Sequence, residues 1–85
     1  MTIHKTVAIR DIQLAAFGRP FYTPTLGAAI RSFHDEAKNP ESMIHNHPED
    51  FELMELGEYN DETGQHKNLD TPRQLSSGKT AKGAA

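Results

Sequence analysis

The side chains best suited to metal chemistry lie in residues 45–50, where the chain reads HNHPED. In an extended loop His45 and His47 would point the same way, and the two acids that follow could add carboxylate ligands for a divalent metal. Pro48 favours a turn instead, and no further ligand is fixed by spacing as in the H-E-x-x-H motif. We therefore expect no metal site, and interpret the segment as a solvated turn that leads into a strand at Phe51.

Two other motifs are weak evidence for catalysis. Paired acids could act as general acid and base, but that role needs burial to shift a pKa, and these pairs fall in expected loops or on an exposed helix face. They are Asp35-Glu36, Glu49-Asp50 and Asp61-Glu62. The segment SSGKT ends like a phosphate-binding loop, but Arg73 replaces the glycine required five positions before Gly78, and we expect no helix after it. With no cysteine for thiolate chemistry, we expect no enzyme and no cofactor.

The length and charge of the chain limit the remaining classes of function. A chain of 85 residues forms one small domain, which buries only about 60% of its unfolded surface, so help from a partner chain is reasonable. Residues 1–75 hold seven basic and twelve acidic residues, whereas the last ten hold two lysines and no acid. A balance of −5 argues against a strongly electrostatic nucleic-acid binder. The chain has no apolar signal core and no membrane-length apolar run, so we expect a soluble intracellular protein without a membrane partner.

The first half of the chain predicts two strands and a helix. IHKTVAIRD alternates with period two, and FGRPFY predicts a second strand, short or at an edge because Pro20 cannot donate to a ladder. We expect Phe17, Phe21 and Phe51 to lie in the core beneath the helix. TPTLGAAIRSFHDEAKNP predicts that helix, with one apolar stripe, a cap at Thr23 or Thr25, and an end at Asn39-Pro40.

The second half predicts a hairpin and a tail. FELMELGEY is apolar on both faces and predicts a central strand, or one sandwiched against a partner. NDETG predicts a turn with Gly64 at positive φ, and QHKNLD the returning strand. We expect pairing to end at Thr71-Pro72, and residues 76–85 to form a flexible basic tail after a single domain of residues 1–75. The order β-β-α-β-β predicts an α+β fold, one antiparallel sheet with the helix on one face. The other face would be covered by a ligand or a second copy, so we expect a homodimer.

Aromatic and basic residues on the strands are the candidates for binding nucleic acid. Proteins that bind single strands combine a sheet carrying aromatic side chains with a few cations. Tyr22 and Tyr59 fall on expected strands, near Lys5, Arg10, Arg19 and Lys67. Composition by itself leaves the function undecided between nucleic acid and protein partners.

Four segments of the chain resemble one viral family. They are VAIRD, FGRPFYTPTLGAAIRSFHDEA, NHPEDFELMELGEYNDETG and LDTPRQL. Together, from about Val7 to Leu75, they are similar to the small non-structural protein of gokushovirus-type microviruses, tailless phages with circular single-stranded DNA. The resemblance implies a protein absent from the virion that acts in the host bacterial cytoplasm on single-stranded DNA or on the switch from replication to packaging. The resemblance assigns no catalytic residues to this chain.

Two hypotheses follow. The first is a dimeric binding protein that contacts single-stranded phage DNA or the replication complex, and Arg73, Lys79 and Lys82 join the six contact residues named above. The second is an interaction or assembly factor that binds a viral replication or capsid protein, or a host protein, through the acidic stretch 49–62. The charge of the sheet face away from the helix separates them. The sequence leaves open which face or edge would form the dimer.

Overall fold

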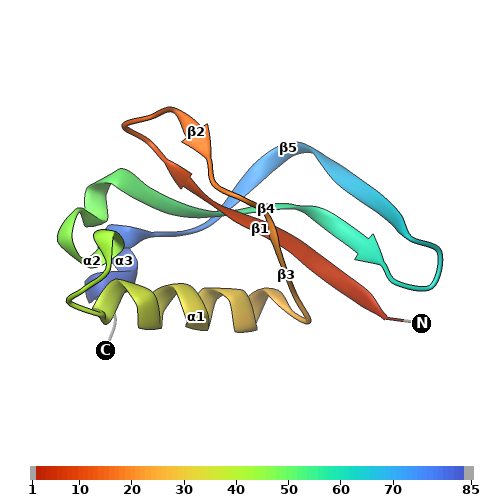
Figure 1. Cartoon of the computed structure of the whole chain (residues 1–85), viewed down its shortest axis with the longest axis horizontal. Coiled ribbons are helices and arrows are strands. Elements are labelled where there is room, and N and C mark those ends of the chain that lie inside the picture. The colour runs from red at the N-terminus through yellow and green to blue at the C-terminus, as the bar shows by residue number, and fades with distance from the viewer. Residues whose placement is uncertain (1, 84–85) are drawn as a thin grey trace.

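The computed structural model describes residues 2–83 and has the α+β fold expected from the sequence (Figure 1). One curled antiparallel sheet carries a helix packed against one of its faces. The elements in chain order are β1 (Ile3–Asp11), β2 (Ala16–Phe17), β3 (Phe21–Thr23), α1 (Leu26–Lys38), α2 (Met43–Asn46), the 3₁₀ helix η1 (Pro48–Asp50), β4 (Phe51–Asn60), β5 (Gln65–Ser77) and α3 (Gly78–Gly83). None of the helices within residues 2–83 has the length and apolar character needed to cross a membrane.

Strand β1 lies inside the sheet because both of its edges are paired. The strand order is β2-β1-β4-β5, with β3 on the same edge of β1 as β2. β1 and β4 pair from Ile3 opposite Asn60 to Asp11 opposite Phe51, with a register shift between Thr6 and Val7. The predicted second strand is thus two short pieces, separated at Gly18, Arg19 and Pro20.

Helix α1 forms as the apolar stripe predicts. Thr25 is its N-cap, and its hydroxyl oxygen accepts a 3.1 Å hydrogen bond from the backbone N–H of Ala28. Ala29, Phe33 and Ala37 are buried on the side that faces the sheet, and Asn39 is the C-cap. These side chains meet Val7 of β1 and Leu53 of β4, the two largest fully buried side chains. We refer to the sheet surface under α1 as the helix face, and to the other surface as the opposite face.

Strand β5 continues past Pro72, so the expected end of pairing at Thr71-Pro72 is wrong. Asn68 lies opposite Gly57 and Arg73 lies opposite Glu55, which leaves residues 69–72 without a partner on β4. Proline has no N–H for a ladder, and here it lies within this unpaired stretch. Pro72 therefore interrupts the pairing without ending the strand.

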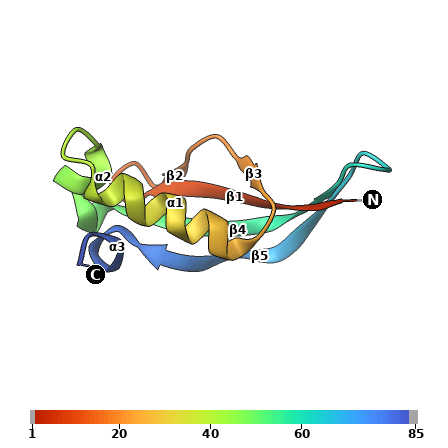
Figure 2. The same cartoon turned by 90° about the horizontal axis from the view of Figure 1, so that it is seen from below.

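The expected flexible tail differs most from the structure. Ser76 and Ser77 complete β5, and α3 follows, so the expectation that no helix comes after SSGKT is also wrong. Ala81 is fully buried in the core cluster, and α3 lies beside α1 and α2 (Figure 2). The tail sequence has few apolar residues, but the methyl group of Ala81 packs in the core cluster with Ala29, Phe33 and Ala37 of α1. Residues 84–85 of the expected tail lie outside the described residues.

The aromatic core was predicted only in part. Phe51 packs against the core cluster, as expected. Phe17 and Phe21, which we expected beneath the helix, are 43% and 38% exposed. Phe17 pairs with Arg10, whose alternation places it on the opposite face, and Phe21 belongs to a three-residue edge strand. The segment expected as a loop before Phe51 contains α2 and η1.

Candidate nucleic-acid interface

Four rings from four strands gather on the opposite face. Val7 packs under α1, so the alternation of β1 places His4 and Thr6 on the other side of the sheet. His4 lies opposite Tyr59 of β4, which in turn lies opposite His66 of β5. Thr6 lies opposite Tyr22 of β3. We call His4, Tyr22, Tyr59 and His66 the ring platform.

The rings of the platform are in mutual contact. Ring centroids are 4.7 Å apart for Tyr59 and His66 and 5.4 Å apart for Tyr22 and Tyr59, with tilted planes. The Tyr22 hydroxyl oxygen is 2.9 Å from Nε2 of His66, a hydrogen bond whose donor depends on the histidine tautomer. Tyr22 is 50% exposed, so solvent reaches the platform. Ala8 and Met54, farther along the same face, are buried, whereas Phe17 at the other end of this face is 43% exposed.

Polar contacts at the ends of the strands hold the platform in place. Asp61, at the β4–β5 turn, accepts a 2.9 Å hydrogen bond from the backbone N–H of Thr2 and lies 3.1 Å from Nε2 of His4. These two bonds, that from Thr2 first, lower the pKa of Asp61 below its ordinary value of 3.8. Lys5 bonds Glu58 at 2.7 Å and lowers the pKa of Glu58 below 4.5. Both acids thus help to join β1 to the hairpin.

Acid is expected to weaken this attachment. In the folded protein the pKa values of Asp61 and Glu58 lie below their ordinary values. The stability that the two carboxylates add is therefore complete when the pH is above the ordinary pKa values. It is lost as the pH falls through the folded-state pKa values. Above about pH 5 we expect the effect of these two groups on the melting temperature of the protein to be constant. Below about pH 4 we expect the melting temperature to fall as their stabilising contacts are lost. Thermal melts from pH 7 to pH 2 measure this. Asp61→Asn should flatten the acid limb, and an unchanged limb would contradict the assignment.

Three of the cations predicted to contact nucleic acid lie on the helix face, away from the rings. Lys5 and Lys67 flank Glu58 there, since Lys5, Glu58 and Lys67 are in register across three strands. Arg73 donates to Glu55 through Nε and Nη2, at 3.0 and 2.6 Å. Glu55 is only 5% exposed, so Arg73 neutralises a buried carboxylate. Lys5 and Arg73 are thus engaged in ion pairs within the chain.

The remaining predicted cations are scattered. Arg10 shares the opposite face with the rings but lies 3.5 Å from a carboxylate oxygen of Glu52 and over the ring of Phe17. Arg19 is exposed in the link between β2 and β3. Lys79 and Lys82 are on α3, and Lys82 donates to the carbonyl oxygen of His45 at 3.0 Å. Of the nine predicted contact residues, the structure brings together only Tyr22 and Tyr59 as a ring pair.

Comparison with known proteins gives one match. A family model described as the phage ORF5 protein matches residues 4–81. The chain belongs to this phage protein family. No curated protein and no solved structure matches it. The phage origin implied by the sequence resemblance is thereby confirmed, whereas the microvirus group remains a prediction.

Sequence reasoning missed two members of the platform in this ORF5-family protein, His4 and His66. The signal for His4 was present, because period-two alternation separates it from Val7. His66 required the hairpin register, in which Asn60 and Gln65 are opposite and the turn is residues 61–64. Once that register is known, His66 must lie beside Tyr59.

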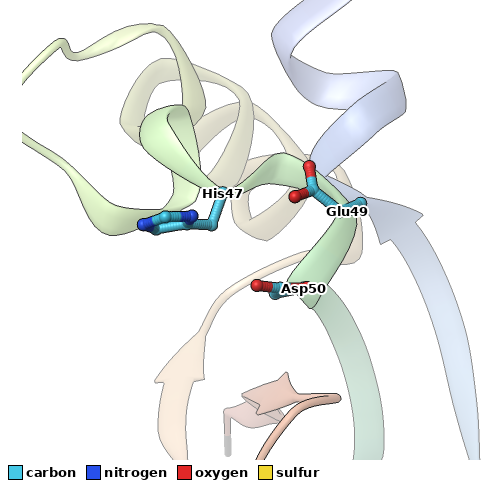
Figure 3. Close-up of side chains that lie close together, drawn as sticks. All are labelled: His47, Glu49 and Asp50. Atoms are coloured by element: carbon cyan, nitrogen blue, oxygen red, sulfur yellow. The ribbon is translucent and has the colours of Figure 1, made fainter.

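Figure 3 shows His47, Glu49 and Asp50, in the segment where we expected a solvated turn. His47, Glu49 and Asp50 bring potential ligand atoms within 4.8 Å of one another, while the His47 ring projects to one side of the two carboxylates. His45 is not part of this group, because its Nδ1 bonds the carbonyl oxygen of Ala37 at 2.9 Å. His47 and Glu49 are exposed, and Asp50 already accepts from Gln13. The expected solvated turn is instead the 3₁₀ helix η1 with exposed side chains at its start, and we assign it no metal function.

Proposed function

We propose that this phage protein binds single-stranded DNA by stacking bases on the ring platform. The observation that carries the proposal is the contact between Tyr22, Tyr59 and His66 on a solvent-accessible sheet surface. Every base has a π-face, so such a surface holds a strand with little regard to sequence.

The charged residues of the opposite face support the DNA-binding proposal less than the rings do. The opposite face is neither clearly basic nor clearly acidic, because Arg10 is paired with Glu52 there. Phosphate contacts would have to come from Arg10, Arg19 and residues that leave their acid partners. We therefore expect the affinity to depend on stacking first, and to fall with salt less steeply than for a binder with many free cations.

Replacing Tyr59 by alanine tests the proposal. Loss of one base–aromatic stack costs about 1–3 kcal/mol, so Tyr59→Ala should weaken binding to a fluorescent oligothymidine about 5- to 150-fold. The matched control Tyr59→Phe keeps the ring and should bind nearly as the parent does. Fluorescence anisotropy at two salt concentrations, with a duplex of the same length alongside, measures both variants. Equal affinity of Tyr59→Ala and parent, or no preference for the single strand, would contradict the platform.

In the infected bacterium this activity would act by occupancy. A protein that covers single-stranded DNA would favour storage or packaging of the genome over further replication. This role fits the microvirus resemblance, and it places the protein in the host cytoplasm and outside the virion. It needs no turnover.

The second candidate function is an interaction or assembly factor that contacts only protein. The acidic stretch 49–62 supports it less than expected, because Glu52, Glu55, Glu58 and Asp61 are bonded within the chain. One different observation favours it: at the β1–β2 turn, Leu14 is 74% exposed, beside other exposed apolar side chains. Absence of DNA binding by the parent protein at low salt would select this function.

A further inference from the structure

The outer edge of β5 offers an interaction surface of unusual length. β5 is the last strand of the sheet, and no other strand within residues 2–83 pairs with its outer side. Residues 65–74 of this thirteen-residue strand are all exposed. An edge strand presents unpaired N–H and C=O groups that another strand can bond. The distal part of the hairpin also extends beyond α1 (Figure 1), where β5 is the edge of a sheet made of β1, β4 and β5.

The middle of β5 is the part best placed to meet another chain. Residues 69–72 have no partner on β4, and Figure 1 shows β5 arching away from β4 in this region. Asp70 is exposed and has no hydrogen-bond or ion-pair partner among the described residues. Leu69 is 38% exposed beside it. A free carboxylate and an exposed leucine therefore lie in the stretch of β5 that has no partner on β4.

We propose that a second copy of this chain pairs with that edge, β5 antiparallel to β5, about a two-fold axis at Asn68. In an antiparallel pair with this symmetry, two residues that lie opposite each other are on the same face of the sheet. Because side chains alternate along a strand, an even-numbered residue therefore lies opposite an even-numbered one. Centred on Asn68, the pairing places His66 of each copy opposite Asp70 of the other. Opposite charges at such cross-strand positions are favourable whenever the histidine is protonated, and imidazole to carboxylate hydrogen bonds form in either state.

Neighbouring registers are less favourable on charge. Centred on Lys67, the pairing would bring two lysines together. Centred on Asp70, it would bring two aspartates together and set Lys67 against Arg73, and like charges directly opposite are destabilising. Centred on Leu69, it would oppose His66 with Pro72, which cannot donate a ladder bond. The charge pattern of β5, together with Pro72, thus selects Asn68 as the centre.

The dimer would extend the proposed nucleic-acid interface, and this consequence rests on the proposed function. Since the axis is perpendicular to the sheet, both ring platforms lie on one side of a continuous sheet. The two copies of His66 then flank the dimer axis, with Tyr59 of each copy one strand farther out. A single strand of DNA could contact both platforms, which predicts a site size about twice that of one subunit.

Single cysteines test the register, because the chain contains none. In Asn68→Cys the two thiols lie opposite each other across the axis, at a separation that a disulfide can bridge. In the matched control Thr71→Cys, exposed on the same strand, the two thiols are about 20 Å apart along the strand direction. Oxidation with glutathione disulfide, read on non-reducing gels without DNA, should convert most of Asn68→Cys to a covalent dimer and leave Thr71→Cys monomeric.

Sedimentation of the cysteine-free protein completes the test. We expect a dimer mass in the parent, and a dimer dissociation constant raised at least tenfold in Asp70→Lys, with Asp70→Asn closer to the parent. A monomer at all concentrations, or Thr71→Cys cross-linking as fast as Asn68→Cys, would overturn the inference. Because these measurements contain no DNA, loss of the proposed DNA binding in a protein that still forms this dimer would contradict only the proposed function.

Discussion

Replacing Phe33 by alanine is expected to lower the free energy of unfolding by about 4 kcal/mol. Phe33 is 2% exposed and lies in the core cluster between α1 and the sheet, with Val7 and Leu53. Removal of its ring leaves a cavity that the surrounding strands and helix fill only in part. A small domain has about 5–15 kcal/mol of stability in total, so this single change removes a large share.

Urea unfolding at fixed protein concentration measures the loss. The control is Phe17→Ala, which removes the same ring from a site that is 43% exposed. There we expect a cost of about 1 kcal/mol or less, because the ring contributes mainly its contact with Arg10. If the two variants lost similar stability, the placement of the core beneath α1 would be wrong.

Gly57→Ala is expected to destabilise the protein by about 3 kcal/mol, for a different reason. A Cβ atom at Gly57 would collide with the backbone carbonyl of Lys67 and lie 2.9 Å from the Cα of Asn68. Backbone atoms of the neighbouring strand cannot move aside as a flexible side chain does, so β4 and β5 must separate. The separation occurs two residues from Tyr59, and it should also disturb the ring contact with His66.

The control for this variant is Gly27→Ala in the first turn of α1. The nearest atom to a Cβ there is 3.9 Å away, and alanine favours a helix over glycine, so a gain of up to about 1 kcal/mol is expected. Thermal melts of both variants give the signs, and near-ultraviolet circular dichroism reports on the tyrosines. A neutral Gly57→Ala would show that β4 and β5 are not packed as closely as described.

The sequence was sufficient for the elements whose pattern is local. The alternation of β1, the apolar stripe of α1 and the turn before β5 depend on residues close in the chain, and Gly64 adopts the expected positive φ, at 74°. Thr25 caps α1 through its own hydroxyl, one of the two alternatives that the sequence left open.

What could not be predicted depends on long-range packing. Whether Phe17 is buried depends on which face α1 covers at that point, and no local pattern contains this information. The burial of Ala81 depends on a gap that exists only after α1 has packed. His66 joins the candidate site through the register of β5, and Lys67 and Arg73 lie away from it for the same reason. The position of Lys5 on the helix face, by contrast, follows from its alternation with Val7 along β1. The types of side chain were evident, but their partners were not.

The position of β1 in the middle of the sheet affects how the chain folds during synthesis. β1 is made first and can pair early with β2 and β3, which follow within twelve residues of its end. Its other edge must wait for β4, and Leu53 and Ala81, which complete the core, are made late. Such distant contacts slow folding. We expect a newly made chain to expose Val7 and Phe33 until the residues up to Ala81 have left the ribosome, and therefore to depend on host chaperones at high expression.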